Sequence, residues 1–175
     1  MKTIIIKKAI TVLAVLVACS AQAQIAISKS TVPNASVSLD FADNQFKGLV
    51  LPYVENKANI VTPGTLIFDV LDKKVKYLKG SSWFDLSVAS DGAVDLSLQT
   101  SKAEVAGAKV SVGKPTGVDG VLVLEESNKA MVLPHAAKPH LNIINPSAGM
   151  MVYDTDSKLL AVYNGTVWTF WGASD

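Results

Sequence analysis

The sequence predicts an all-β protein made of two three-stranded meander repeats that are joined by a thin β-rich connector into an elongated molecule. After residue 24 the apolar segments are short, rich in Val, Leu, Ile and aromatic residues, and bounded by Gly, Asp, Asn, Ser or Pro. Such segments with turn signals every 8 to 12 residues or so are typical of all-β proteins. No segment carries the apolar stripe that predicts a long amphipathic helix. Two parts of the chain also repeat one another, as described below.

Residues 1–23 have the layout of a secretory signal peptide, which is absent from the mature protein. Met1–Lys8 carries three lysines, an uncharged apolar run follows over Ala9–Ala18, and Ala21-Gln22-Ala23 forms an Ala-x-Ala cleavage site before Gln24. The apolar run is much shorter than the roughly 20 residues that a membrane-spanning helix needs. We therefore expect an exported protein without a transmembrane helix, either secreted or held in the periplasm or on the outer surface.

A second cleavage site overlaps the first. Leu16-Val17-Ala18-Cys19 resembles the lipobox of bacterial lipoproteins, in which the cysteine is acylated and becomes the new N-terminus. Acyl chains on Cys19 would hold the protein on a membrane, because each buried CH₂ contributes about 0.8 kcal/mol. The complete Ala-x-Ala site favours cleavage after Ala23, and the membrane-anchored lipoprotein is the alternative.

The composition of the chain excludes several classes of function. The chain has 175 residues and a net charge of +1, and all of its 16 basic residues are lysines. Removal of the three lysines of the signal leaves a mildly acidic protein with no cysteine if cleavage follows Ala23. The lack of arginine argues against nucleic-acid recognition. A single cysteine excludes an internal disulfide and a cysteine-based zinc site.

The internal repeat is the most informative feature of the sequence. Lys47–Pro52 aligns with Lys129–Pro134 at an offset of 82 residues, and Gly64–Trp83 aligns with Gly149–Trp168 at an offset of 85. The second alignment keeps five residues identical, which are Gly64, Asp69, Lys73, Gly80 and Trp83 in the first copy and Gly149, Asp154, Lys158, Gly165 and Trp168 in the second.

Each copy predicts a meander of three strands. The first strand ends at Asp69 or Asp154, which opens a tight turn, and the second ends at Gly80 or Gly165, because aspartate and glycine suit such connections. The third strand carries Trp83 or Trp168, which we expect to pack as a large lid on the core of its repeat. The predicted organisation is a signal peptide (residues 1–23), a first β-repeat module (24–88), a connector or stalk (89–120) and a second module (121–175).

The repeated unit resembles a module of exported flavobacterial-type proteins and of phage tail-fibre-like proteins. The resemblance lies in the Lys-Gly-Leu-Val-Leu-Pro stretch, the Pro-Gly before a Phe-Asp strand, and the Tyr-x-x-Gly-Ser-x-Trp strand. It implies an elongated, often trimeric, β-rich surface or fibre protein. An arginine commonly follows the Leu-Pro of that module, whereas Tyr53 and His135 occupy this position here.

The sequence offers few candidates for catalysis. It contains no Gly-x-Ser-x-Gly elbow, no P-loop and no Gly-x-Gly-x-x-Gly. His135 and His140 are the only histidines, and without further ligand spacing they predict a solvated loop pair rather than a metal or proton-transfer site. Asp154 and Asp156 could supply oxygens to a cation, but a turn role is favoured because the EF-hand pattern is missing. We expect no enzyme activity and no cofactor, whereas a hydrolase would require carboxylates that converge in a cleft.

Aromatic residues are the best candidates for ligand binding. The counterpart of Trp171 in the first repeat is Leu86, so an aromatic side chain at this position is not a requirement of the repeated fold. We expect it to serve as an oligomer contact or a ligand platform, with Tyr53 and His135 as weaker candidates. The sequence thus predicts a non-enzymatic structural or adhesion-type protein of the cell envelope or surface. We expect it to form a homo-oligomer, specifically a trimer, and to bind a glycan or another surface partner. The alternative is a carbohydrate-binding module that uses exposed aromatic residues.

Overall fold

The computed structural model describes residues 24–92, 94–103, 105 and 107–172. Within these residues the regular secondary structure is almost entirely β-strand, and the helices α2 (Ser97–Thr100) and α3 (Pro139–Asn142) are single turns. This confirms the predicted all-β class. The expected signal peptide, including Cys19, lies outside the described residues.

The first meander forms the core of a four-stranded sheet. Its strands are β4 (Tyr53–Val54), β5 (Leu66–Asp69), β6 (Lys74–Lys79) and β7 (Ser82–Asp85), in that order. The strands β5, β6 and β7 are antiparallel neighbours, as expected of a meander, while β4 runs parallel to β5. The sequence analysis missed β4, because two residues are too few to show an alternating pattern.

The second meander repeats the first strand for strand. Its sheet contains β11 (His135–Ala136), β12 (Met150–Asp154), β13 (Leu159–Tyr163) and β14 (Trp168–Trp171). The strand β11 runs parallel to β12, and the other pairs are antiparallel.

The register of the two sheets is also the same. Phe68 lies opposite Val75 in the first sheet, and the residues 85 positions later, Tyr153 and Leu160, lie opposite each other in the second. The predicted repeat is therefore a structural repeat, with the same turns and the same register.

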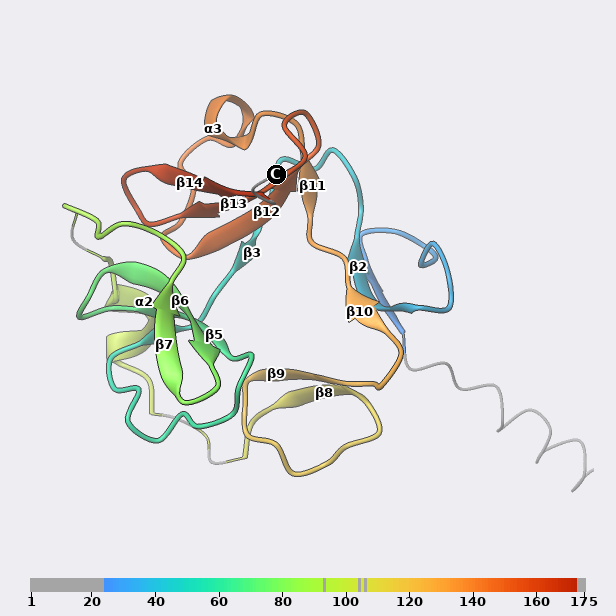
Figure 1. The fold of residues 1–175 in the computed structure, drawn as a ribbon, viewed down its shortest axis with the longest axis horizontal. Coiled ribbons are helices and arrows are strands. Elements are labelled where there is room, and N and C mark those ends of the chain that lie inside the picture. The colour runs from blue at the N-terminus through green and yellow to red at the C-terminus, as the bar shows by residue number, and fades with distance from the viewer. Residues whose placement is uncertain (1–23, 93, 104, 106, 173–175) are drawn as a thin grey trace, which may run out of the picture.

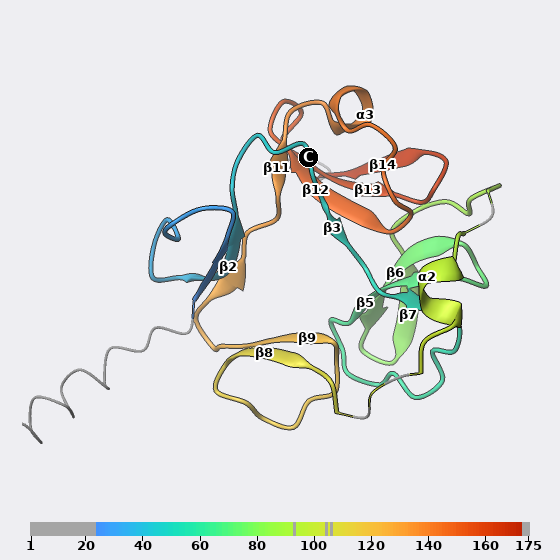
Figure 2. The same ribbon diagram turned by 180° about the vertical axis from the view of Figure 1, so that it is seen from behind.

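The two repeats are interlocked. Strand β3 (Leu49–Val50), which precedes the first sheet, pairs with β12 of the second sheet. The N–H of Leu51 continues this pairing by donating to the carbonyl of Gly149 at 3.0 Å. Figures 1 and 2 show β3 running from the second sheet toward the first.

An apolar core joins the two sheets. Phe68 and Val75 of the first sheet belong to the same buried cluster as Met151 and Val162 of the second. A second cluster lies around Val152, on the opposite face of the second sheet, and includes Ile143 from the segment that follows α3. Strands β12 and β13 alternate between these two clusters, as expected when both faces of a sheet are covered.

The remaining strands are parallel and lie outside the two repeated sheets. Strands β1 (Ile25–Ile27), β2 (Val37–Phe41) and β10 (Ala130–Met131) form one parallel sheet with β2 in the middle. Strands β8 (Val110–Gly113) and β9 (Leu122–Glu125) form a separate parallel pair. The segment 89–120, expected to be a thin connector, thus contains α2 and β8, and β8 pairs with β9 of the following segment.

Candidate functional site

Two partly exposed aromatic residues, Trp171 and Phe84, lie where the two repeated sheets meet. Trp171 on β14 packs edge-on against Phe84 on β7, with ring centroids 5.8 Å apart, and Phe84 in turn lies 5.3 Å from Tyr77 on β6. Trp171 and Phe84 are 37% and 40% exposed. We call Trp171, Phe84 and Tyr77 the aromatic row, and its partly exposed rings offer the kind of apolar surface on which ligands stack.

Trp171 also fastens the two sheets together. Its indole N–H donates to the carbonyl oxygen of Leu86 at 2.6 Å. Leu86 is the repeat counterpart of Trp171, so the hydrogen bond joins equivalent positions of the two repeats. The tryptophan therefore has a structural role in addition to its exposed ring face.

Tyr53 and His135 occupy equivalent places in the two repeats and do not join the aromatic row. Tyr53 on β4 lies 5.4 Å from the ring of Phe68, and His135 on β11 lies 5.4 Å from the ring of Tyr153. Burial raises the pKa of Tyr53, and the charge of Asp95 adds to this effect. The Nδ1 atom of His135 is 2.9 Å from Asp43, in the loop after β2. Each of these candidates has its own separate set of neighbours.

The two histidines are not brought together either. His140, on α3, packs edge-on against Phe170 on β14 at 5.7 Å. It lines a shallow pocket of about 450 Å³ together with Lys138, Asp156 and Leu159, beside the helix that the second repeat carries and the first lacks. Among the residues that the structure describes, no group of three or more His, Cys, Asp or Glu side chains is placed to hold a metal ion.

Asp69 and Asp154 cap the turns that follow their strands. Asp69 accepts hydrogen bonds from the N–H groups of Leu71 and Asp72, both at 3.1 Å. Asp154 accepts from the N–H groups of Asp156 at 2.9 Å and Lys138 at 3.0 Å.

Hydrogen bonding also sets the charge state of Asp154. Burial alone would raise its pKa, but the hydroxyl of Ser157 and the N–H groups of Asp156, Lys138 and Ser157 outweigh burial and lower it. This is the turn role that the sequence favoured over cation binding.

The other conserved positions of the repeat serve the same turns and strands. Gly80 and Gly165 have φ values of 61° and 104°, in the region that glycine adopts without strain. Trp168 is half-buried, packs against the cluster around Val152 and lies 5.1 Å from the ring of Tyr163. Trp83 is half-buried opposite Leu78.

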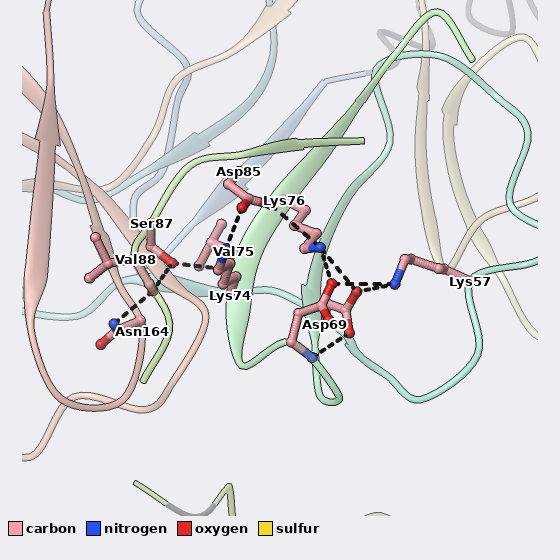
Figure 3. A network of polar contacts seen from close by, with 10 residues as sticks. Lys57, Asp69, Lys74, Val75, Lys76, Asp85, Ser87, Val88 and Asn164 are labelled. Atoms are coloured by element: carbon pink, nitrogen blue, oxygen red, sulfur yellow. Dashed lines mark hydrogen bonds and ion pairs between the residues drawn. The ribbon is translucent and has the colours of Figure 1, made fainter. Parts of the chain in front are cut away.

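An ion-pair network covers the outer face of the first sheet and was not foreseen (Figure 3). Lys76 on β6 is 8% exposed and contacts three carboxylates: it hydrogen-bonds to Asp72, and it lies 3.5 Å from Asp69 and 3.4 Å from Asp85. Lys57 adds a 2.5 Å contact to Asp69, and Lys74 a 2.6 Å contact to Asp85. The signal in the sequence was the alternation of Lys74 and Lys76, which places both on one face of a strand.

The network shifts the charge states of its members. Burial alone would lower the pKa of Lys76, but its hydrogen bond to Asp72 and the nearby charges of Asp85 and Asp69 raise it. The hydrogen bond from Lys76 lowers the pKa of Asp72. Burial would raise the pKa of Asp85, but Lys74 and Lys76 outweigh it and lower the value. The lysines of the network therefore favour the charged form of Asp72 and of Asp85.

Asn164 forms a second link between the sheets, which Figure 3 shows beside the network. Its side chain is fully buried, accepts from the N–H groups of Thr166 and Val167 at 2.8 Å each, and donates to the carbonyl of Val88 at 2.9 Å. The repeat gave no signal for this residue, because its counterpart Lys79 is exposed.

Comparison with known proteins supports an assembling, fibre-like protein. Residues 112–174 match the family model described as the phage tail like trimerisation region. The match begins in β8 and includes α3 and the strands β11–β14. It supports the predicted tail-fibre-like module and a structural homo-oligomer. No curated protein and no solved structure matches the chain. Within its described residues, the structure contains no helix long and apolar enough to cross a membrane.

Proposed function

We propose that this protein is a non-enzymatic structural component of the cell envelope or surface, exported and assembled as a homotrimer in a fibre-like or adhesive structure. The observation that carries the proposal is the match of residues 112–174 to a phage tail like trimerisation region. The first repeat extends this argument, because its sheet has the same strand order and register as the matched one.

The use of the charged residues supports a structural role. A catalytic site requires titratable groups that are free to bind substrate or to exchange protons. Here Asp69 and Asp154 cap turns, and Asp72 and Asp85 pair with lysines of the network. These carboxylates hold the repeated sheets in their register.

Export is proposed from the N-terminal sequence. The processed protein begins at Gln24 if the Ala-x-Ala site is used, or at an acylated Cys19 if the lipobox is used. Mass spectrometry of the N-terminal peptide distinguishes the two products. If the protein of the native cell is found in the cytoplasm and still begins at Met1, the proposed export is contradicted.

Trimer formation is tested by light scattering on the processed protein after size-exclusion chromatography. We expect a molar mass three times that of the chain. A single-chain mass at micromolar concentration would contradict the proposed function.

A carbohydrate-binding module is the second candidate, favoured by the aromatic row at the junction of the two sheets. The rings of Trp171 and Phe84 are both partly exposed and could stack on the face of a sugar. A glycan-array screen tests this candidate. Phe84→Ala should abolish any binding found, whereas Tyr153→Ala, which changes an aromatic residue outside the row, should preserve it.

A further inference from the structure

The parallel pair β8–β9 has the features of an incomplete sheet. Among the described residues, β8 and β9 pair only with each other, which leaves the outer edge of each strand without a neighbouring strand. Two strands alone are marginally stable in water, and an open edge is a template for pairing with another chain. The pair therefore has two open edges that no described residue of the chain fills.

Each face of the pair is only partly satisfied by the rest of the chain. One face is open at its start, where Val110 and Leu122 lie opposite each other and are 53% and 41% exposed, and is covered further along, where Val112 is buried. The other face carries Ser111 and Glu125, whose Oγ and Oε1 atoms are buried without a hydrogen-bond partner. Exposed apolar area and unpaired buried polar atoms both reduce stability.

We propose that the neighbour is a second copy of this chain, with β9 of one copy pairing in parallel with β8 of the next. This inference depends on the proposed trimer and adds the surface that forms it. The match to the trimerisation region begins at residue 112, inside β8, and includes β9. The pair is thus continuous with the part of the chain that the assembly is expected to use.

Charge complementarity favours a second copy over another partner. The exposed lysines Lys109 and Lys114 flank β8, whereas Glu125 and Glu126 lie at the end of β9, where Glu126 also lies 3.3 Å from Lys129 of its own chain. In a parallel pairing that repeats the register within the chain, Lys114 of one copy lies beside Glu126 of the next, because Gly113 pairs with Glu125. Opposite charges on adjacent strands stabilise a sheet and oppose a wrong register.

A ring of three copies joined in this way leaves no open strand edge. An interface between two different edges is heterologous, and it forms a closed ring when the rotation between copies closes. Three pairs in such a ring form a continuous six-stranded arrangement in which no outer edge of β8 or β9 stays open. Closure removes the edges that would otherwise promote aggregation.

Single lysine substitutions on the pair test the inference. Val110→Lys and Leu122→Lys each place a charge on the proposed interface. Val61→Lys and Leu71→Lys are the matched controls, because these residues are 76% and 73% exposed and lie in loops of the first repeat. Molar mass is measured by light scattering at a concentration where the unmodified protein is a trimer.

Folding of each variant is followed by tryptophan fluorescence. All three tryptophans lie in the repeated sheets, so their emission reports these sheets independently of β8–β9. We expect both interface variants to lose the trimer with unchanged emission, and both controls to keep it.

Backbone hydrogen exchange provides a second measurement. The amides of residues 110–113 and 122–125 should exchange slowly in the trimer and much faster in the Val110→Lys monomer.

The outcomes separate this inference from the proposed function. If the unmodified protein is a trimer and both interface variants remain trimers, the pairing of β8 with β9 is wrong and the proposed function is unaffected. If the unmodified protein is a monomer, the proposed function and this inference fail together.

Discussion

Asn164 provides the sharpest test of how the two repeats are joined. Replacement by alanine removes three hydrogen bonds, two from the N–H groups of Thr166 and Val167 and one to the carbonyl of Val88. Each such bond contributes about 1 kcal/mol net, so Asn164→Ala should lower the free energy of unfolding by about 3 kcal/mol. For a chain of this size that corresponds to a fall in melting temperature of roughly 6 to 12 °C.

The repeat supplies a matched control for this variant. Lys79 occupies the equivalent position in the first sheet and is exposed, so Lys79→Ala should change the free energy of unfolding by less than about 0.5 kcal/mol. Both variants are unfolded in urea at one fixed protein concentration, since assembly makes stability depend on concentration. Tryptophan fluorescence follows the transition. If Asn164→Ala and Lys79→Ala have the same effect, the side chain of Asn164 does not join the sheets.

Two further predictions concern the charged network and a close contact between the sheets. The pKa of Asp72 is lowered in the folded protein and that of Lys76 is raised. The stabilisation from Asp72 is therefore fully present above the unfolded carboxyl pKa of about 4, and that from Lys76 below the unfolded lysine pKa of about 10.4. The free energy of unfolding should therefore fall as pH drops through the lowered pKa of Asp72 or rises through the raised pKa of Lys76. Lys76→Met should lower the free energy of unfolding by about 2 kcal/mol at pH 7 and weaken both pH dependences. Identical pH profiles for the unmodified protein and the variant in chemical denaturation would contradict this prediction. Gly149 and Gly64 have φ values of 76° and 86°, but a Cβ on Gly149 would lie 3.0 Å from Phe68 while one on Gly64 meets nothing within 4 Å. Both glycine-to-alanine variants should lose about 1 to 2 kcal/mol from backbone strain, and Gly149→Ala about 1 to 3 kcal/mol more from crowding, whereas equal melting temperatures would refute the close contact.

The sequence predicted the meanders well because their determinants are local. Asp69 and Asp154 mark the turns, and Gly80 and Gly165 mark the next ones, so the internal repeat alone predicted three strands in each copy, which the structure contains. The same information could not reveal β4 or β11. These strands have two residues each and pair in parallel through contacts that the local pattern does not encode.

The candidate site was predicted only in part. Trp171 was singled out because it departs from the repeat, and the structure places it in the aromatic row with Phe84. Its hydrogen bond to Leu86 and the links formed by Asn164 connect different sheets. Such contacts depend on how the two sheets pack on one another, which a turn pattern does not determine. The charge of Lys76 was visible in the sequence, but its three partners come from separate turns and strands.

The molar mass of the processed protein in solution tests the central claim most directly. The chain carries a second repeated sheet within a match to a trimerisation region, together with a parallel strand pair whose edges are open. Light scattering at micromolar concentration should therefore give three times the mass of one chain. A mass of one chain, with native tryptophan fluorescence, would contradict the account.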